Sequence, residues 1–168
     1  VYATLNGYRN DVFESYAFVS EDFGATWTSI STGLTEAVNV VVEDSANENI
    51  LYVGTDNGLY ISLDRGNTFM SANNATLPNV AVHDLKVHHR DNELIVATHG
   101  RSIYIADVKK LQKLTPENPT GRHPSGKTRL RCSCNCCILQ CIIIDIHPVK
   151  RLFSFTFIRN FKFYFAII

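Results

Sequence analysis

Residues 62–69 read Ser62-Leu63-Asp64-Arg65-Gly66-Asn67-Thr68-Phe69, and residues 20–27 read Ser20-Glu21-Asp22-Phe23-Gly24-Ala25-Thr26-Trp27. Both stretches follow the pattern S-x-D-x-G-x-T-aromatic, and equivalent residues lie 42 positions apart. A pattern of this length that recurs in register indicates an internal repeat of about 40 residues.

Each copy is predicted to form the tip of a β-hairpin. The Asp carboxylate can accept hydrogen bonds from backbone N–H groups of the turn, and the Gly two residues later can supply a positive φ. The Thr returns the chain to extended backbone, and the aromatic residue is expected to point inward and pack. We therefore interpret Asp22 and Asp64 as structural rather than catalytic. A calcium loop is rejected, because neither copy has the further acidic positions that such a loop needs.

The repeat extends beyond these eight residues. Residues 51–62 are echoed by residues 94–105 with one residue inserted in the second turn, and an apolar run precedes each of them. Alternating side chains and β-branched or aromatic residues predict strands in the central unit. These strands are expected at 39–43, 50–55, 58–63 and 68–71. A period of 42 to 44 residues with four strands is typical of a propeller blade.

The predicted fold class is all-β: an incomplete β-propeller of about three four-stranded blades, with a poorly ordered C-terminal tail. The blades are a partial first (1–30, with a longer loop over 5–16), a full second (38–72) and a third (80–108). The third lacks the repeated motif and is expected to be the last, followed by a helical turn over 108–114. Because a closed ring takes roughly 4–8 blades, the chain is expected to be a fragment.

Charge and cysteine content divide the chain near Leu114. Residues 1–117 hold 15 acidic and eight basic residues and no cysteine, whereas residues 118–168 hold eight basic residues, one acid and all five cysteines. The two predicted regions are the blades (1–114) and a linker with a Cys/Phe/Ile-rich tail (115–168). We interpret the tail as non-native or disordered, the product of a frameshift or read-through. A sticky strand pair or a membrane-surface segment over 152–168 remains an alternative.

Metal and membrane interpretations of the tail are weak. The cysteines at 132, 134, 136, 137 and 141 contain a single C-x₂-C pair, whereas zinc sites show paired spacings. The apolar run 138–149 is too short to span a bilayer and is interrupted by Asp145, His147 and Pro148. No metal, cofactor, nucleic-acid partner or confident membrane span is therefore predicted.

The eight-residue motif resembles the Asp-box, or BNR repeat, of sialidases, sortilin-type receptors and related β-propellers. Residues 77–85 together with 98–104 are similar to the terminal blades of bacterial secreted proteins described as BNR-repeat glycosyl hydrolases or sortilin-like proteins. The resemblance covers residues 1–114 and implies a secreted, periplasmic or cell-surface scaffold that binds a glycan, peptide or protein. No signal peptide is visible, and the remaining blades of a parent chain would be partners.

Two other functions follow from the same resemblance. The parent could be a glycoside hydrolase whose catalytic carboxylates lie mostly on missing blades, or an assembly factor for a membrane complex. No catalytic residue is assigned in this chain. A sialidase would need three arginines, of which Arg9 and Arg101 alone are available, and Asp11 with Asp56 makes an unsupported carboxylate pair.

Strand parity places the second turn of each blade and the connections between blades on one face. In propellers that resemble this chain, ligands meet that face. Its candidate ligand residues are Arg9, Asp11, Asp56, Asn57, His99 and Arg101, joined by Thr35, Glu36, Asn73 and Asn74 from the connections. Each has a structural alternative: Asp56 and Asn57 suit a tight turn, and Arg101 could pair with an acid of a neighbouring blade. Asn74-Ala75-Thr76 is also a glycosylation sequon.

Overall fold

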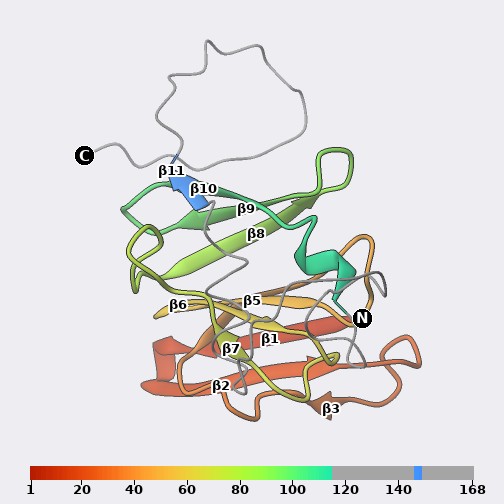
Figure 1. The fold of residues 1–168 in the computed structure, drawn as a ribbon. Coiled ribbons are helices and arrows are strands. Elements are labelled where there is room, and N and C mark those ends of the chain that lie inside the picture. Colours follow the sequence, from red (N-terminus) through yellow and green to blue (C-terminus); the bar gives the residue numbers. More distant parts are fainter. Residues whose placement is uncertain (115–145, 149–168) are drawn as a thin grey trace, which may run out of the picture.

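The computed structural model describes residues 1–114 and 146–148, which form three antiparallel sheets. The sheets are stacked one above another in chain order (Figure 1). We call them blade 1, blade 2 and blade 3. Apart from two short 3₁₀ turns, the regular structure of the described residues is β-strand, as the fold class predicts.

Blade 2 has four strands that neighbour one another in chain order. They are β4 (Val38–Glu43), β5 (Leu51–Thr55), β6 (Gly58–Ser62) and β7 (Met70–Ser71). All five residues of β5 are buried, because blades 1 and 3 cover its two faces. A strand covered on both sides can be continuously apolar, and the sequence of β5 is so except for Gly54 and Thr55.

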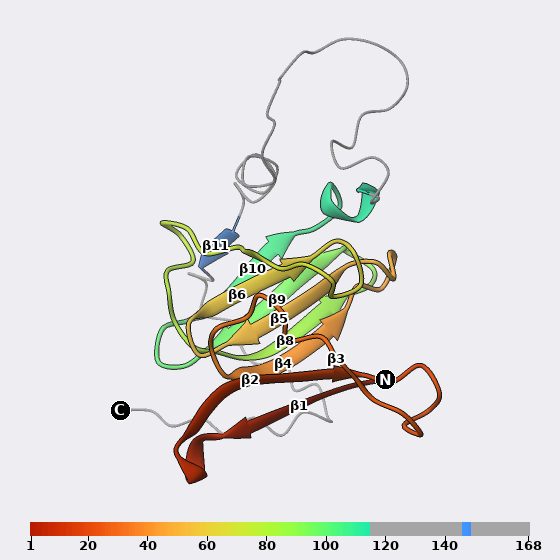
Figure 2. The same cartoon turned by 90° about the horizontal axis from the view of Figure 1, so that it is seen from below.

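Blade 1 consists of β1 (Tyr2–Gly7), β2 (Val12–Val19) and β3 (Thr28–Ser29). The motif follows β2 as it follows β6, so β1 is equivalent to β5, the second strand of blade 2. The predicted long loop over 5–16 is instead a continuation of both strands, with Leu5 paired to Tyr16. A 3₁₀ turn, η1 (Tyr8–Asn10), closes a hairpin tip that extends beyond the neighbouring sheet (Figure 2).

Blade 3 contains β8 (Val82–His88), β9 (Glu93–Thr98) and β10 (Ile103–Asp107). Its outer position is taken by β11 (Ile146–Pro148), which pairs antiparallel with β10. The sequence analysis did not predict this strand. The other predictions for the tail, including its poor order and the cysteine cluster, concern residues 115–145 and 149–168 and lie outside the described residues.

Two apolar clusters hold the three blades together. The cluster between blades 1 and 2 includes Ala17, Ile30 and Leu51, and the larger cluster between blades 2 and 3 includes Tyr52, Leu94 and Val96. Full burial of a side chain of the size of Leu51, Leu94 or Val96 contributes about 1.5–3 kcal/mol to stability. The blades are therefore joined mainly by face-to-face packing of their sheets.

The innermost strands of blades 2 and 3 carry the same irregularity. Pairing of β4 with β5 skips Asn39, between Val38 and Val40, and pairing of β8 with β9 skips His83. An unpaired residue of this kind is a β-bulge, which redirects its side chain relative to the regular ladder. Asn39 and His83 are thus equivalent positions in consecutive blades.

The last described segment before the tail returns to blade 2. A single 3₁₀ turn, η2 (Leu111–Lys113), forms where the sequence predicts a helical turn, and it lies beside the β4–β5 loop (Figure 1). Leu111 and Leu114 are buried in the cluster between blades 2 and 3.

Candidate functional site

The first repeated motif forms a turn closed by its own side chains. Asp22 Oδ1 accepts a hydrogen bond from Thr26 N at 2.8 Å, and Asp22 Oδ2 accepts one from Thr26 Oγ1 at 2.6 Å. Ser20 Oγ donates to Asp22 Oδ1 at 2.8 Å and accepts from Gly24 N at 2.7 Å. The Asp–Thr and Ser–Gly contacts hold both ends of the turn between β2 and β3.

The second motif repeats these contacts. Thr68 N and Thr68 Oγ1 donate to the two carboxylate oxygens of Asp64 at 2.9 and 2.6 Å. Ser62 Oγ donates to Asp64 Oδ1 at 2.8 Å and accepts from Gly66 N at 2.8 Å. With both carboxylate oxygens engaged inside the turn, the geometry is that of a structural element rather than of a reacting group.

The hydrogen bonds lower the pKa of both aspartates. Donation by the Thr26 side chain, then by its backbone and by Ser20, lowers the pKa of Asp22 to about 2. Burial acts to raise the pKa of Asp64, but hydrogen bonds from Thr68 and Ser62 outweigh it and the pKa is lowered. Both groups are therefore ionised at neutral pH.

The two aromatic residues of the motifs differ in their surroundings. Phe69 packs against the cluster between blades 1 and 2, as expected, whereas Trp27 is 45% exposed. Trp27 lies on blade 1 at the position of Phe69, which is partly buried because blade 1 packs against it. The expectation that Trp27 points inward is wrong for the described residues, since none of them covers that face.

At the opposite end of the strands, the second turn of each blade meets the connection into its innermost strand. Asp56 N donates to Ala37 O at 3.1 Å in blade 2, and His99 N donates to Ala81 O at 2.9 Å in blade 3. These contacts bring Asp56 beside Asn39 and His99 beside His83. We call this end of the blades the open face.

Asn39 connects all three blades on the open face. Its Oδ1 accepts a hydrogen bond from Asn6 Nδ2 at 3.0 Å, and its Nδ2 donates to Asp56 Oδ1 at 2.8 Å and to Val82 O at 3.2 Å. Asn6, Asp56 and Val82 belong to blades 1, 2 and 3, respectively. The sequence analysis missed Asn39, although a single Asn within the apolar run 38–42 is a signal that could have drawn attention to it.

The equivalent positions in blade 3 hold two imidazoles. The ring centroids of His83 and His99 lie 5.2 Å apart with an interplanar angle of 47°. Both residues are exposed. The bulge and the second turn therefore present an amide with a carboxylate in blade 2, and a pair of imidazoles in blade 3.

Asn73 supports the turn that carries Asn57. Its Nδ2 donates to Asn57 O at 2.8 Å and to Asn79 Oδ1 at 2.9 Å, and its Oδ1 accepts from Leu59 N at 3.0 Å. A Cβ on Gly58, whose φ is +129°, would lie 2.1 Å from Asn73 Oδ1, so only glycine fits this turn. Asn57 is therefore held through its backbone carbonyl, as expected for a residue of a tight turn.

The remaining candidates lie apart from this cluster. Arg9 and Asp11 lie at the tip of the β1–β2 hairpin, and Asp11 has a left-handed φ of 56°. Arg101 is exposed in the β9–β10 turn. Within residues 1–114, no hydrogen bond or ion pair joins these three side chains to Asn39, Asp56 or His99. Of the connection residues, Glu36 accepts a hydrogen bond from Ser15 at its carbonyl, and Asn74 Oδ1 caps the turn over 74–77.

A buried carboxylate lies at the other end of blade 2, away from the open face. Asp44 is 4% exposed and accepts hydrogen bonds from Ala46 N, Asn47 N, the Tyr52 hydroxyl and Gln112 Nε2. Burial, followed by the neighbouring Asp44 carboxylate, raises the pKa of Tyr52, so its hydroxyl remains a neutral donor. This network holds η2 against the β4–β5 loop, and no sequence argument singled out its members.

Among residues 1–114 and 146–148, no group of three or more His, Cys, Asp or Glu side chains is placed to hold a metal ion. Over the same residues, no helix has the length and apolar character that a membrane crossing requires.

Three consecutive blade-like sheets, two of which carry the Asp-box in equivalent turns, define a propeller-type binding scaffold. The family model for Sortilin-Vps10, described as "Sortilin, neurotensin receptor 3", matches residues 15–118. The chain therefore belongs to the sortilin family, in agreement with the sortilin-like resemblance of the repeats. Comparison with curated proteins gave no match, and neither did comparison with solved structures.

Proposed function

We propose that the chain is the C-terminal part of a sortilin-type propeller that binds a peptide or protein ligand on its open face. The observation that carries this proposal is the connection of three blades through Asn39. It fixes a row of exposed polar groups that no neighbouring segment of the described chain covers. Fixed polar groups lose little conformational entropy on binding, which favours affinity.

The chemistry of the open face suits a polar ligand. Asp56 offers a carboxylate whose Oδ1 is oriented by Asn39, and His83 with His99 offers ring nitrogens that can donate or accept. Arg101 lies in the same turn as His99 and could bind a carboxylate of the ligand. Such an array would recognise backbone amides and charged side chains of a peptide rather than a large apolar surface.

Selection from a library of random 12-residue peptides against the purified chain tests this proposal. The affinity of a selected peptide should fall in the double variant His99→Ala/Arg101→Ala. It should also fall in the separate variant Asp56→Ala. Lys109→Ala is the matched control, since Lys109 is an exposed cation after β10, at the other end of the strands, and pairs only weakly with Asp107 at 3.8 Å. Unchanged affinity in all open-face variants would remove the proposal.

We also propose that residues 1–114 form the functional unit, that the parent protein is exported, and that this chain does not catalyse hydrolysis. Sortilin-like domains are typically extracellular or lumenal, which supports export.

Hydrolysis of a glycoside by inversion or retention needs two carboxyl groups roughly 5–9.5 Å apart. Asp56 is engaged by Asn39, and Asp11 lies on a separate hairpin, so neither has an evident catalytic partner. Turnover of β-glucans or sialosides by the purified chain would contradict this.

A further inference from the structure

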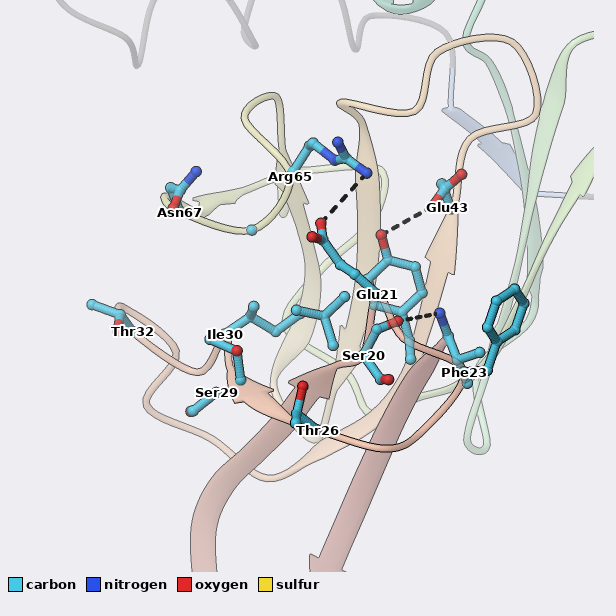
Figure 3. Close-up of a pocket in the computed structure, with 15 residues that line it drawn as sticks. Ser20, Glu21, Phe23, Thr26, Ser29, Ile30, Thr32, Glu43, Arg65 and Asn67 are labelled. Carbon is cyan, nitrogen blue, oxygen red and sulfur yellow. Dashed lines mark hydrogen bonds and ion pairs between the residues drawn. The ribbon is translucent and has the colours of Figure 1, made fainter.

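A groove of about 860 Å³ opens beside the two Asp-boxes, at the end of the strands opposite the open face (Figure 3). It lies between blade 1 and blade 2, with the segment 26–32, which includes β3, on one side and the second Asp-box turn on the other. Its volume falls within the usual range for small-ligand sites. Nothing in the proposed function uses this groove.

Polar groups of several kinds line the groove. Six hydroxyl side chains contribute to it: Tyr2, Ser20, Thr26, Thr28, Ser29 and Thr32. The charged and amide groups are Glu21, Glu43, Arg65 and Asn67. Of its apolar contributors, Val19 and Ile30 are already packed in the cluster between the two blades, whereas Val1 and Phe23 are exposed. The groove therefore offers hydrogen-bonding groups and lacks a deep apolar pocket for a peptide side chain.

The charged groups are oriented but keep hydrogen-bonding capacity. Arg65 Nη2 lies 3.9 Å from Glu21 Oε1, a loose and exposed pair, and the Tyr2 hydroxyl donates to Glu43 Oε2 at 2.9 Å. Burial and the hydrogen bond to Glu43 raise the pKa of Tyr2 to about 12, so Tyr2 remains a neutral donor to that carboxylate. Planar groups such as carboxylate and guanidinium have paired acceptors or donors that match neighbouring hydroxyls of a sugar ring.

Phe23 is the least expected residue at the groove. Its side chain is 97% exposed, and its backbone has a left-handed φ of 58°. A left-handed conformation is unfavourable for a bulky residue, and Asn or Gly would adopt it more easily. Phe23 thus stabilises neither its turn nor a core, yet its ring stands at one end of the groove (Figure 3). Arg65 occupies the equivalent position of the second Asp-box, also with a φ of 58°.

We propose that this groove binds a neutral oligosaccharide. The apolar face of one sugar ring would stack on Phe23, and hydroxyls would hydrogen-bond to Glu21, Glu43 and Arg65. Two carboxylates face one guanidinium and the Val1 ammonium, so the charged groups of the groove balance and offer a sulfated or sialylated chain no net positive charge. The hydroxyl-lined walls suit a sugar, whose ring hydroxyls can each donate and accept a hydrogen bond. The site is separate from the peptide site proposed on the open face.

Calorimetric titration of the full chain with cellohexaose, maltohexaose, xylohexaose and sialyllactose tests this inference. At least one neutral hexaose should bind and sialyllactose should not. Phe23→Asn removes the ring but suits the left-handed turn, so it should weaken binding about tenfold without lowering the melting temperature. Arg65→Asn applies the same change to the second turn and should also weaken binding. The control is Phe13→Ala, since Phe13 is an exposed aromatic on β2 that does not line the groove.

Three results would each overturn the inference: no binding by any neutral hexaose, equal affinity for sialyllactose, or unchanged affinity in folded Phe23→Asn and Arg65→Asn. Competition by the peptide selected for the open face would also overturn it, because that would place a peptide in the groove. The outcome is distinguishable from failure of the peptide proposal, since His99→Ala with Arg101→Ala leaves the groove intact.

Discussion

Replacing Asp44 with alanine should destabilise the chain by about 3 kcal/mol, chiefly by leaving a buried hydroxyl without an acceptor. The Tyr52 hydroxyl donates to Asp44 Oδ2 at 2.8 Å, and Tyr52 has no solvent exposure. Leaving such a donor unsatisfied costs about 1–3 kcal/mol. The hydrogen bonds from Ala46 N, Asn47 N and Gln112 Nε2 are partly buried, so water can replace some of them, and together they add about 1–2 kcal/mol.

A double-mutant cycle gives the sharper measurement. Tyr52→Phe alone should cost about 1.5 kcal/mol, because it removes one hydrogen bond to a carboxylate. In the Asp44→Ala background, the same change removes the unsatisfied hydroxyl and should be neutral or stabilising. Urea unfolding followed by circular dichroism supplies the four free energies of unfolding. Full additivity of the two changes, or a loss below about 1 kcal/mol for Asp44→Ala, would refute the reasoning.

Three further predictions concern the Asp-boxes and the open face. Gly66→Ala should lower the free energy of unfolding, measured in urea, by more than Gly33→Ala does. Both glycines have a left-handed φ (+91° and +88°). A Cβ on Gly66 would lie 3.3 Å from Ile30 Cβ, whereas a Cβ on Gly33 would meet no atom within 4 Å. The strain common to both is about 1–2 kcal/mol, and equal losses would contradict the packing argument. Because the folded pKa of Asp64 is lowered, the stability that it contributes is present above pH about 4 and is lost as the pH falls through the folded value. Thr68→Val should therefore reduce stability at neutral pH and flatten the acid dependence of the melting temperature; an unchanged dependence would exclude this role. Asn39→Leu should cost about 1–2 kcal/mol and speed amide hydrogen exchange around Val82, whereas protection equal to that of the parent would show that Asn39 does not join the blades.

The regular parts of the fold could be predicted from the sequence because they repeat. The strands of the central unit were expected at 39–43, 50–55, 58–63 and 68–71, and they occur as Val38–Glu43, Leu51–Thr55, Gly58–Ser62 and Met70–Ser71. Alternation and spacing fix such elements locally. The shortest strand, β7, was the least accurate, because two paired residues leave little pattern to read.

Features that depend on distant packing could not be predicted. Gln112 reaches Asp44 across 68 residues, and β11 joins β10 from within the tail; no local pattern specifies either partner. Trp27 shows the same limit, because its motif indicates burial but its exposure depends on which sheet lies alongside.

The face on which Asp56 and His99 lie could be expected from the sequence, but the hydrogen bonds that join the blades there could not. Strand parity brought Asp56 and His99 to one face, since it follows from counting turns. The bulge at Asn39 was missed because one extra residue in an apolar run does not reveal which residue is unpaired. As a result, the residue that joins the three blades was absent from the predicted set.

At the repeated bulge, backbone hydrogen bonds on both sides hold the innermost strand in its sheet, and the unpaired residue carries the side chain that faces the solvent. Backbone pairing on either side of Asn39 and His83 is alike, although one side chain is an amide and the other an imidazole. A substitution at either place changes the side chain that the bulge displays, while the register of the ladder on both sides of the bulge can be kept. Consecutive blades can therefore differ in the chemistry of this one displayed position while sharing the same backbone arrangement of the sheet.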